Sequence, residues 1–175
     1  MSETRRIVTG TVDGKSVFAV DDKVAPTTIA LAPGAGFTRV YGTETLQIPV
    51  TGTAVSITPY YPPVGGVTVT VVTLPPDPKA PPPADFDPTP FMAEAQEKLP
   101  GLLELMEPDG MHVTPTVDVI TIISGRIVLE LDDGAKRELS AGDVVVQNGT
   151  RRGWRNPFDE PVVMHVVSVG VEAGT

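Results

Sequence analysis

The stretch from residue 110 to residue 156 most constrains the fold of this chain, because it consists of short strand-like runs separated by turn residues. Three apolar runs within it, at residues 117–123, 127–131 and 144–146, are rich in β-branched side chains, which favour strands. The turn at residues 132–134 is Asp-Asp-Gly, which suits a tight hairpin because glycine readily adopts positive φ. The pattern predicts an antiparallel meander with no helix inside it.

The same stretch resembles the cupin family in both of that family's motifs. The first motif is a glycine, a His-x-His pair, a carboxylate and a second glycine, and its last four positions are held here by His112, Thr114, Asp118 and Gly125. The second begins with Gly-Asp, passes through a strand to a Gly-Thr turn and ends with a histidine before Trp-x-Asn. Its counterparts are Gly142-Asp143, Gly149-Thr150 and Trp154-Arg155-Asn156, with Arg152 where the histidine is expected.

The resemblance implies an all-β fold, a cupin-type antiparallel β-barrel or jelly roll, also described as a double-stranded β-helix. We expect one domain over residues 1–175, with the barrel at 66–170 and an N-terminal β extension at 1–65. Within the barrel region, a proline-rich connector is expected at residues 75–90 and one short helix at 90–106.

Other strands are expected from local patterns along the chain. Residues 5–11 and 15–20 flank an Asp-Gly hairpin signal, and residues 27–31 and 37–41 flank a Pro-Gly pair. Residues 67–73 and a closing strand at 161–169 are strongly apolar, and between Gly42 and Gly66 scattered prolines favour extended or edge segments. Thr89 is expected to cap the helix with Pro90 at its first turn, and the helix either covers the barrel mouth as a lid or packs outside it.

The metal site of the family is expected to be lost. Metal-binding cupins typically use two histidines and a carboxylate from the first motif and a histidine from the second. This chain keeps His112, shortens the carboxylate to Asp118, and has Thr114 and Arg152 at the other two positions. Because a guanidinium is cationic and has no lone pair to donate, we expect no cofactor. A divalent transition metal held by His112, Asp118 and His165 is the alternative.

The candidate catalytic residues are His112 and Asp118, which share strand parity and combine an imidazole with a carboxylate that can transfer protons. Thr114, Gln147, Arg152 and Trp154 are the candidate substrate-binding residues. A guanidinium pairs with carboxylate or enolate oxygens, and an indole stacks on a planar ring. The alternatives place Arg152 in a solvated rim and Trp154 in the core.

Charge and composition limit the partners. The formal net charge is −9, and no basic cluster longer than a pair occurs, which argues against nucleic acids and anionic membranes. The chain has no cysteine, which excludes disulfides and thiol catalysis. No secretory signal or run of about 18 apolar residues is present, so a cytoplasmic location is expected. The edge-type strands of the extension favour a homodimer.

These features together predict a cupin-fold small-molecule protein. Its function is expected to be metal-free or metal-poor acid/base chemistry of the isomerase, dehydratase, cyclase or decarboxylase type on a planar or anionic metabolite. One alternative is a cupin that binds a metabolite without catalysis. The other is a metal-dependent oxygenase whose metal is bound by His112, Asp118 and His165.

Overall fold

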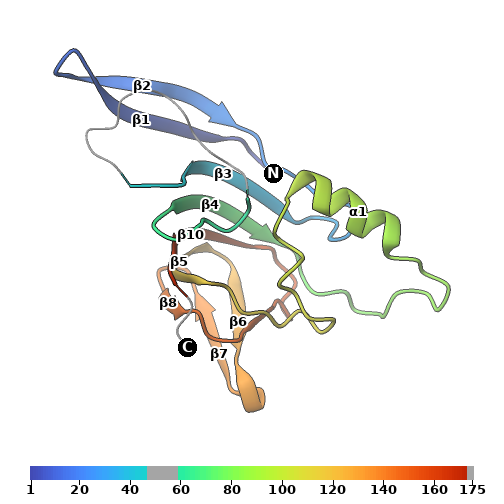
Figure 1. Cartoon of the computed structure of the whole chain (residues 1–175). Helices are drawn as coiled ribbons and strands as arrows, with labels where there is room; N and C mark the ends of the chain where they lie inside the picture. Colours follow the sequence, from blue (N-terminus) through green and yellow to red (C-terminus); the bar gives the residue numbers. More distant parts are fainter. Residues whose placement is uncertain (47–58, 173–175) are drawn as a thin grey trace.

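Five strands form the larger of the two antiparallel sheets that make up the barrel, and their residues alternate between a buried and an outer face as the sequence pattern requires. The computed structural model describes residues 1–46 and 59–172. In spatial order the strands are β3 (Gly36–Thr43), β4 (Val67–Leu74), β10 (Val162–Gly170), β5 (Thr116–Ser124) and β8 (Val144–Asn148), which fan out as shown in Figure 1. The predicted strands at 37–41, 67–73, 117–123 and 161–169 all lie in this sheet.

A smaller sheet faces the first and closes the barrel. Its order is β7 (Lys136–Ser140), β6 (Arg126–Glu130) and β9 (Gly153–Arg155), and a short 3-10 turn at Asp132–Gly134 joins β6 to β7. The all-β antiparallel barrel expected from the sequence is confirmed. The expected meander is wrong, because β5 and β6 follow each other in the chain but belong to different sheets. The chain changes sheets at Gly125, where φ is +77°.

The inner face of the larger sheet combines polar and apolar side chains. On β5 the buried residues are Thr116, Asp118, Ile120 and Ile122, whereas Val119, between Asp118 and Ile120, is 40% exposed. Ile120 and Ile122 belong to the same buried cluster as Met164 on β10. The apolar core therefore fills one part of the barrel, and the polar side chains that accompany it on the same face are left to line a cavity.

The N-terminal extension is a hairpin that lies beside the barrel. Strands β1 (Thr4–Val12) and β2 (Lys15–Val24) pair with each other alone, and Figure 1 shows them next to β3. Asp13 and Gly14 both have positive φ, as a two-residue hairpin turn requires. The expected strand at 27–31 is wrong, because only Thr27 makes an isolated bridge. Of the extended region expected at 42–66, residues 47–58 lie outside the described residues.

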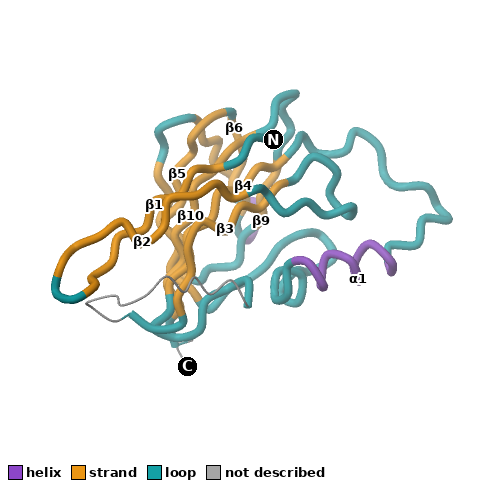
Figure 2. Tube along the Cα trace, turned by 90° about the horizontal axis from the view of Figure 1, so that it is seen from above, coloured by secondary structure: helices purple, strands orange, loops and turns teal. Residues whose placement is uncertain are grey.

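One α-helix occurs in the described residues, and it packs on the outside of the barrel. Helix α1 (Thr89–Lys98) stands to one side of the strands in Figure 2. Pro88 occupies its N-cap position without a side-chain cap, so the capping role expected of Thr89 is wrong. Ala95 is buried in the core, and the side chain of Glu94 accepts a hydrogen bond from the Ala30 amide at 2.8 Å. Over the described ranges, no helix has the length and apolar character needed to cross a membrane.

Candidate functional site

A buried ion pair dominates the polar end of the barrel cavity. The Nη2 atom of Arg152 donates to Oδ2 of Asp118 at 2.9 Å, and their side chains are 4% and 3% exposed. The Nη1 atom of Arg152 donates to Oγ1 of Thr114 at 2.8 Å, and Thr114 also accepts a hydrogen bond from Thr116. Arg152 therefore points into the barrel, and two residues of the first motif fix its orientation.

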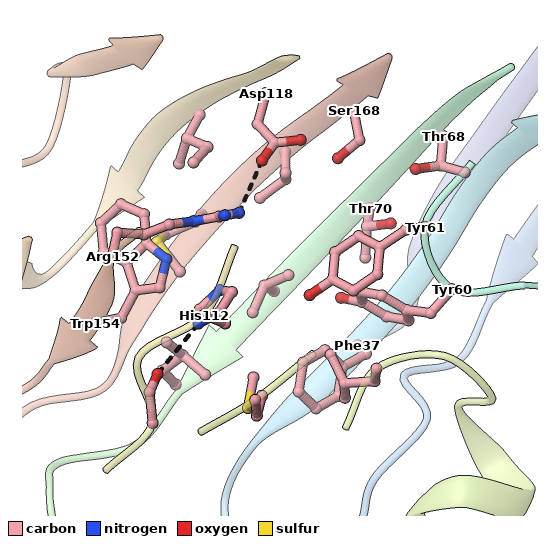
Figure 3. A pocket seen from close by; sticks show the side chains of 18 of the residues that line it. Phe37, Tyr60, Tyr61, Thr68, Thr70, His112, Asp118, Arg152, Trp154 and Ser168 are labelled. Atoms are coloured by element: carbon pink, nitrogen blue, oxygen red, sulfur yellow. Dashed lines mark hydrogen bonds and ion pairs between the residues drawn. The ribbon is translucent and has the colours of Figure 1, made fainter. Parts of the chain in front are cut away.

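The ion pair leaves two buried polar atoms without a hydrogen-bond partner among the described residues. These are Nε of Arg152 and Oδ1 of Asp118, a donor and an acceptor on opposite members of the pair. An unsatisfied buried polar atom costs about 1–3 kcal/mol, so a site that keeps two of them is a candidate for binding a molecule that supplies the missing partners. In Figure 3 the carboxylate of Asp118 extends between Arg152 and Ser168.

His112 lies beside Arg152 and is held in one tautomer. The two residues exchange backbone hydrogen bonds of 2.9 and 3.0 Å, which place their side chains on neighbouring positions of the wall. Nδ1 of His112 is 3.1 Å from the Gly110 carbonyl oxygen. Because a carbonyl only accepts, Nδ1 carries the proton of the neutral ring, and Nε2 keeps its lone pair with no partner among the described residues.

Burial keeps the His112 ring neutral. It is the main cause that lowers the pKa of His112, and the positive charge of Arg152 lowers this pKa further. The Gly110 hydrogen bond and the charge of Asp118 act in the opposite direction and only reduce the shift. At neutral pH the residue therefore presents an unprotonated nitrogen to the cavity, which is the form a general base requires.

A wall of hydroxyl groups faces His112 and Arg152 across the cavity. It consists of Tyr60, Tyr61, Thr68, Thr70 and Ser168, which come from β4, β10 and the segment preceding β4 (Figure 3). Burial raises the pKa of Tyr61 to about 12, so its hydroxyl stays protonated and can donate a hydrogen bond at any ordinary pH. None of the five was predicted from the sequence. The alternation of residues along β4 and β10 puts Thr68, Thr70 and Ser168 on the inner face of the sheet. This alternation predicts the face of a sheet, but it does not predict a cavity.

The cavity between these walls holds about 260 Å³. Trp154 and Phe37 belong to its lining, and Phe37 meets the ring of Tyr60 edge to face with centroids 6.0 Å apart. The volume lies just below the usual range for ligand pockets, which suits a metabolite of about one ring with its substituents. Arg155 also reaches the lining, although its Nε is paired with Glu130 at 2.7 Å.

Two of the predicted substrate-binding residues lie outside this lining. Gln147 is buried, and its amide donates to the backbone oxygen and the hydroxyl of Thr150, so the structure does not place it with the other candidate residues. Thr114 lies behind Arg152 and acts on the cavity only through that side chain. The remaining predicted residues, His112, Asp118, Arg152 and Trp154, all line the cavity.

The alternative metal set is wrong, because the structure does not bring its three residues together. His165 alternates on β10 with Met164 and Val166, which line the cavity, so its side chain lies on the outer face of the sheet. No cluster of three or more His, Cys, Asp or Glu with the geometry of a metal site occurs in residues 1–46 and 59–172. The carboxylate of Asp118 is already paired with a guanidinium, so the cavity residues do not fit a divalent metal.

Comparison with known proteins identifies a family for the site region. Residues 102–168 match the family model described as "Cupin domain". A segment of 46 residues is 50% identical to Oryzines biosynthesis cluster protein J of Aspergillus oryzae and covers 26% of each chain. Over 46 residues the chain is also 48% identical to Phomopsin biosynthesis cluster protein D of Diaporthe leptostromiformis, covering 26% of this chain and 24% of that one. The matched segment thus spans about a quarter of each relative.

Solved structures with similar folds are more distant in sequence. An uncharacterized conserved protein with a double-stranded β-helix domain from Klebsiella pneumoniae is 18% identical, with 86% of each chain covered and a TM-score of 0.46. A Cupin 2 conserved barrel domain protein from Salinispora arenicola is 17% identical, with 81% of each chain covered and a TM-score of 0.41.

Proposed function

We propose that this member of the cupin family, whose cupin domain spans residues 102–168, carries out metal-independent acid/base chemistry on a small planar or anionic metabolite. The observation that carries the proposal is the pairing, on one wall of the cavity, of a guanidinium with a neutral imidazole whose Nε2 has no partner among the described residues. The reaction would be of the isomerase, dehydratase, cyclase or decarboxylase type. Cupin folds support many chemistries, so the proposal rests on the site and not on the fold.

The roles follow from the contacts of each residue. Nε2 of His112 would remove a proton from a carbon next to a carbonyl or carboxylate group. Arg152 uses two of its five N–H groups on Thr114 and Asp118, so others remain for the oxygen on which negative charge develops. The protonated hydroxyl of Tyr61 would add a second donor from the opposite wall. Asp118 would keep Arg152 in place and accept a hydrogen bond through its free oxygen.

Two further observations support a small-molecule role. The relatives that share a segment with this chain carry names that assign them to biosynthesis clusters. Apart from the polar residues described above, the lining of the cavity is largely apolar and includes Trp154, Phe37, Leu102 and Met106. A planar ring would bury its faces there while its polar substituent reaches the ion pair.

Proton abstraction can be tested with phenylpyruvate, which is planar, anionic and has an acidic C–H bond. We expect the protein to accelerate exchange of its methylene protons in D₂O above the buffer rate, as followed by ¹H NMR. His112→Gln should slow this exchange about 100-fold or more, the range typical of a lost general base. His165→Gln is the matched control, since that imidazole lies on the outer face, and should leave exchange unchanged.

The alternative function, a metabolite-binding cupin without catalysis, predicts a different result in the same experiment. Phenylpyruvate or benzoate would raise the melting temperature in proportion to its occupancy, but no exchange would occur. Arg152→Gln should abolish that thermal shift if the carboxylate binds at the ion pair. If neutral sugars were the only compounds to shift the transition, the anionic-ligand proposal would be refuted.

A further inference from the structure

A second cavity of about 340 Å³ adjoins the barrel cavity and is assigned no role by the proposed reaction. We call it the outer chamber. It lies between the loop that contains Ala32, the proline-rich segment that follows β4, and the turn after α1 that contains Leu103. No residue of α1 is among the described residues that line this chamber, whereas Leu102, Leu103 and Met106 of the segment after the helix do line it.

The outer chamber is contiguous with the barrel cavity. The two share five lining residues, which are Phe37, Leu74, Leu102, Met106 and Trp154. The wall between them is therefore one side chain thick. Met106 is 39% exposed and is unbranched, so it can change rotamer without disturbing a packed core. A molecule bound at the ion pair could extend across this wall without any movement of the strands.

The lining of the outer chamber offers almost no polar partner. Among the described residues that line it, Asp77 carries a carboxylate, Asn156 an amide and Trp154 an indole N–H, and the rest are apolar. The amide of Asn156 donates to the Glu160 carbonyl at 2.9 Å, and its oxygen accepts from the Phe158 amide at 3.2 Å. Asp77 is exposed at the solvent side. The other lining residues are aliphatic, aromatic or proline, so the chamber fits hydrocarbon and not a second polar group.

We propose that the outer chamber binds the aliphatic tail of the molecule whose polar head occupies the barrel cavity. The substrate class is then an amphipathic metabolite, with a planar or carboxylated head and an alkyl or prenyl chain. This inference rests on the proposed function for the head group and adds a binding site for the tail. The lining that the two cavities share and the change from the partly polar lining of the barrel cavity to the apolar lining of the outer chamber are the observations that carry it.

The test uses a homologous series of 4-alkylbenzoates, from benzoate to 4-heptylbenzoate, with dissociation constants measured by isothermal titration calorimetry. Each buried methylene contributes about 0.8 kcal/mol, so affinity should rise about fourfold per carbon until the chamber is full. Ala32→Phe, at a residue that lines only the outer chamber, should remove this gain and leave the affinity for benzoate itself unchanged. Ala30→Phe, an exposed position outside both linings, is the matched control.

A second variant, Leu103→Trp, fills the same chamber from the opposite wall and serves if Ala32→Phe fails to fold. The series is repeated with neutral 4-alkylbenzamides. A chain-length gain in either series that the filling variants remove supports the outer chamber, and no gain in both series overturns it. If benzamides bind and benzoates do not, the anionic head group proposed above is wrong, while the tail site is judged on the benzamide series alone.

Discussion

At the scale of single residues, the polar part of the cavity is defined by a buried ion pair inside the barrel. Arg152 brings a permanent positive charge, and Asp118 compensates it at 2.9 Å. The pair makes the polar end of the cavity dipolar rather than cationic, so a monoanionic or neutral polar group suits it better than a polyanion. The same pair places a positive charge next to His112, whose pKa it helps to lower.

The protonation of His112 gives the first prediction. Its pKa in the folded protein should lie below the value of about 6.5 that imidazole has in an unfolded chain. Because the unfolded chain then binds a proton that the folded chain does not, the free energy of unfolding should fall as pH decreases below about 6.5, until the folded pKa is passed. ¹H NMR titration measures this pKa directly, with His165→Gln used to assign the two imidazole signals.

Replacing Arg152 by glutamine should raise the His112 pKa, since it removes a neighbouring positive charge and leaves the Asp118 carboxylate. If the titration curve of His112 were unchanged in that variant, Arg152 would not lie close enough to His112 to affect its pKa.

The ion pair gives the second prediction, on stability. Arg152→Met should lower the free energy of unfolding by about 3–5 kcal/mol, because it leaves Asp118 charged and buried without its partner. Asp118→Leu should cost a similar amount. In the double variant the charge is absent altogether, so most of the loss should be recovered. Urea unfolding of the four proteins measures this cycle, and single variants that each lose less than about 1 kcal/mol would show that solvent reaches the pair.

At the scale of strands and turns, Gly125, where the chain passes from the larger sheet to the smaller one, is constrained both by its backbone conformation and by a close neighbour. Gly125 has φ of +77°, and a Cβ atom there would lie 2.5 Å from the Pro161 carbonyl oxygen. Gly134 has φ of +69°, but a Cβ atom would meet nothing within 4 Å. The two positions therefore separate backbone strain from steric contact.

The third prediction uses this contrast. Gly134→Ala should reduce the free energy of unfolding by about 1–2 kcal/mol, the cost of a left-handed backbone for a residue with a Cβ. Gly125→Ala should cost more, because the backbone of β10 must also move away from the new methyl group. Denaturant unfolding of both variants under one set of conditions compares the two losses. Equal losses would mean that the β5–β6 corner relaxes without cost.

The strands that could be predicted from the sequence are those with alternating or continuous β-branched residues, such as β4, β5 and β10. Strand β7 was missed, because its sequence, Lys-Arg-Glu-Leu-Ser, is almost entirely polar and lies on an exposed edge. The pairing of β6 was also wrong, since local turn signals do not state to which sheet the next strand belongs. Within the site, motif positions located His112 and Arg152, whereas the tyrosines come from a segment without a motif.

At the scale of the whole molecule, the outer face of the larger sheet is apolar and open. Val144 and Val146 on β8 are 58% and 57% exposed, and Val146 pairs with the exposed Val119 on β5. Next to them, the outward positions of β10 are occupied by Val163, His165, Val167 and Val169. No acidic residue lies among these positions, although the chain carries a formal charge of −9. Two copies of this negatively charged chain repel each other electrostatically, and the repulsion is weakest where they meet through a face without acidic residues.

The hairpin at the opposite edge also carries an exposed apolar side chain. Phe18 is 78% exposed, and among the described residues β1 and β2 pair only with each other. A two-stranded hairpin is marginally stable by itself in water, so a second surface packed against it would contribute to its stability. A homodimer would provide two such surfaces, one from each copy, and closed two-fold symmetry would bury both apolar regions together.

The fourth prediction is therefore that the protein is a homodimer at micromolar concentration, with the outer face of β5, β8 and β10 in the interface. Light scattering coupled to size-exclusion chromatography should give twice the mass of one chain. Val146→Lys places a charge in the middle of the apolar face and should convert the dimer to a monomer with an intact fold. Ala84→Lys adds the same charge on the exposed proline-rich connector and should leave the dimer unchanged. A wild-type monomer would exclude the dimer, whereas a dimer that persists in Val146→Lys would place its interface elsewhere.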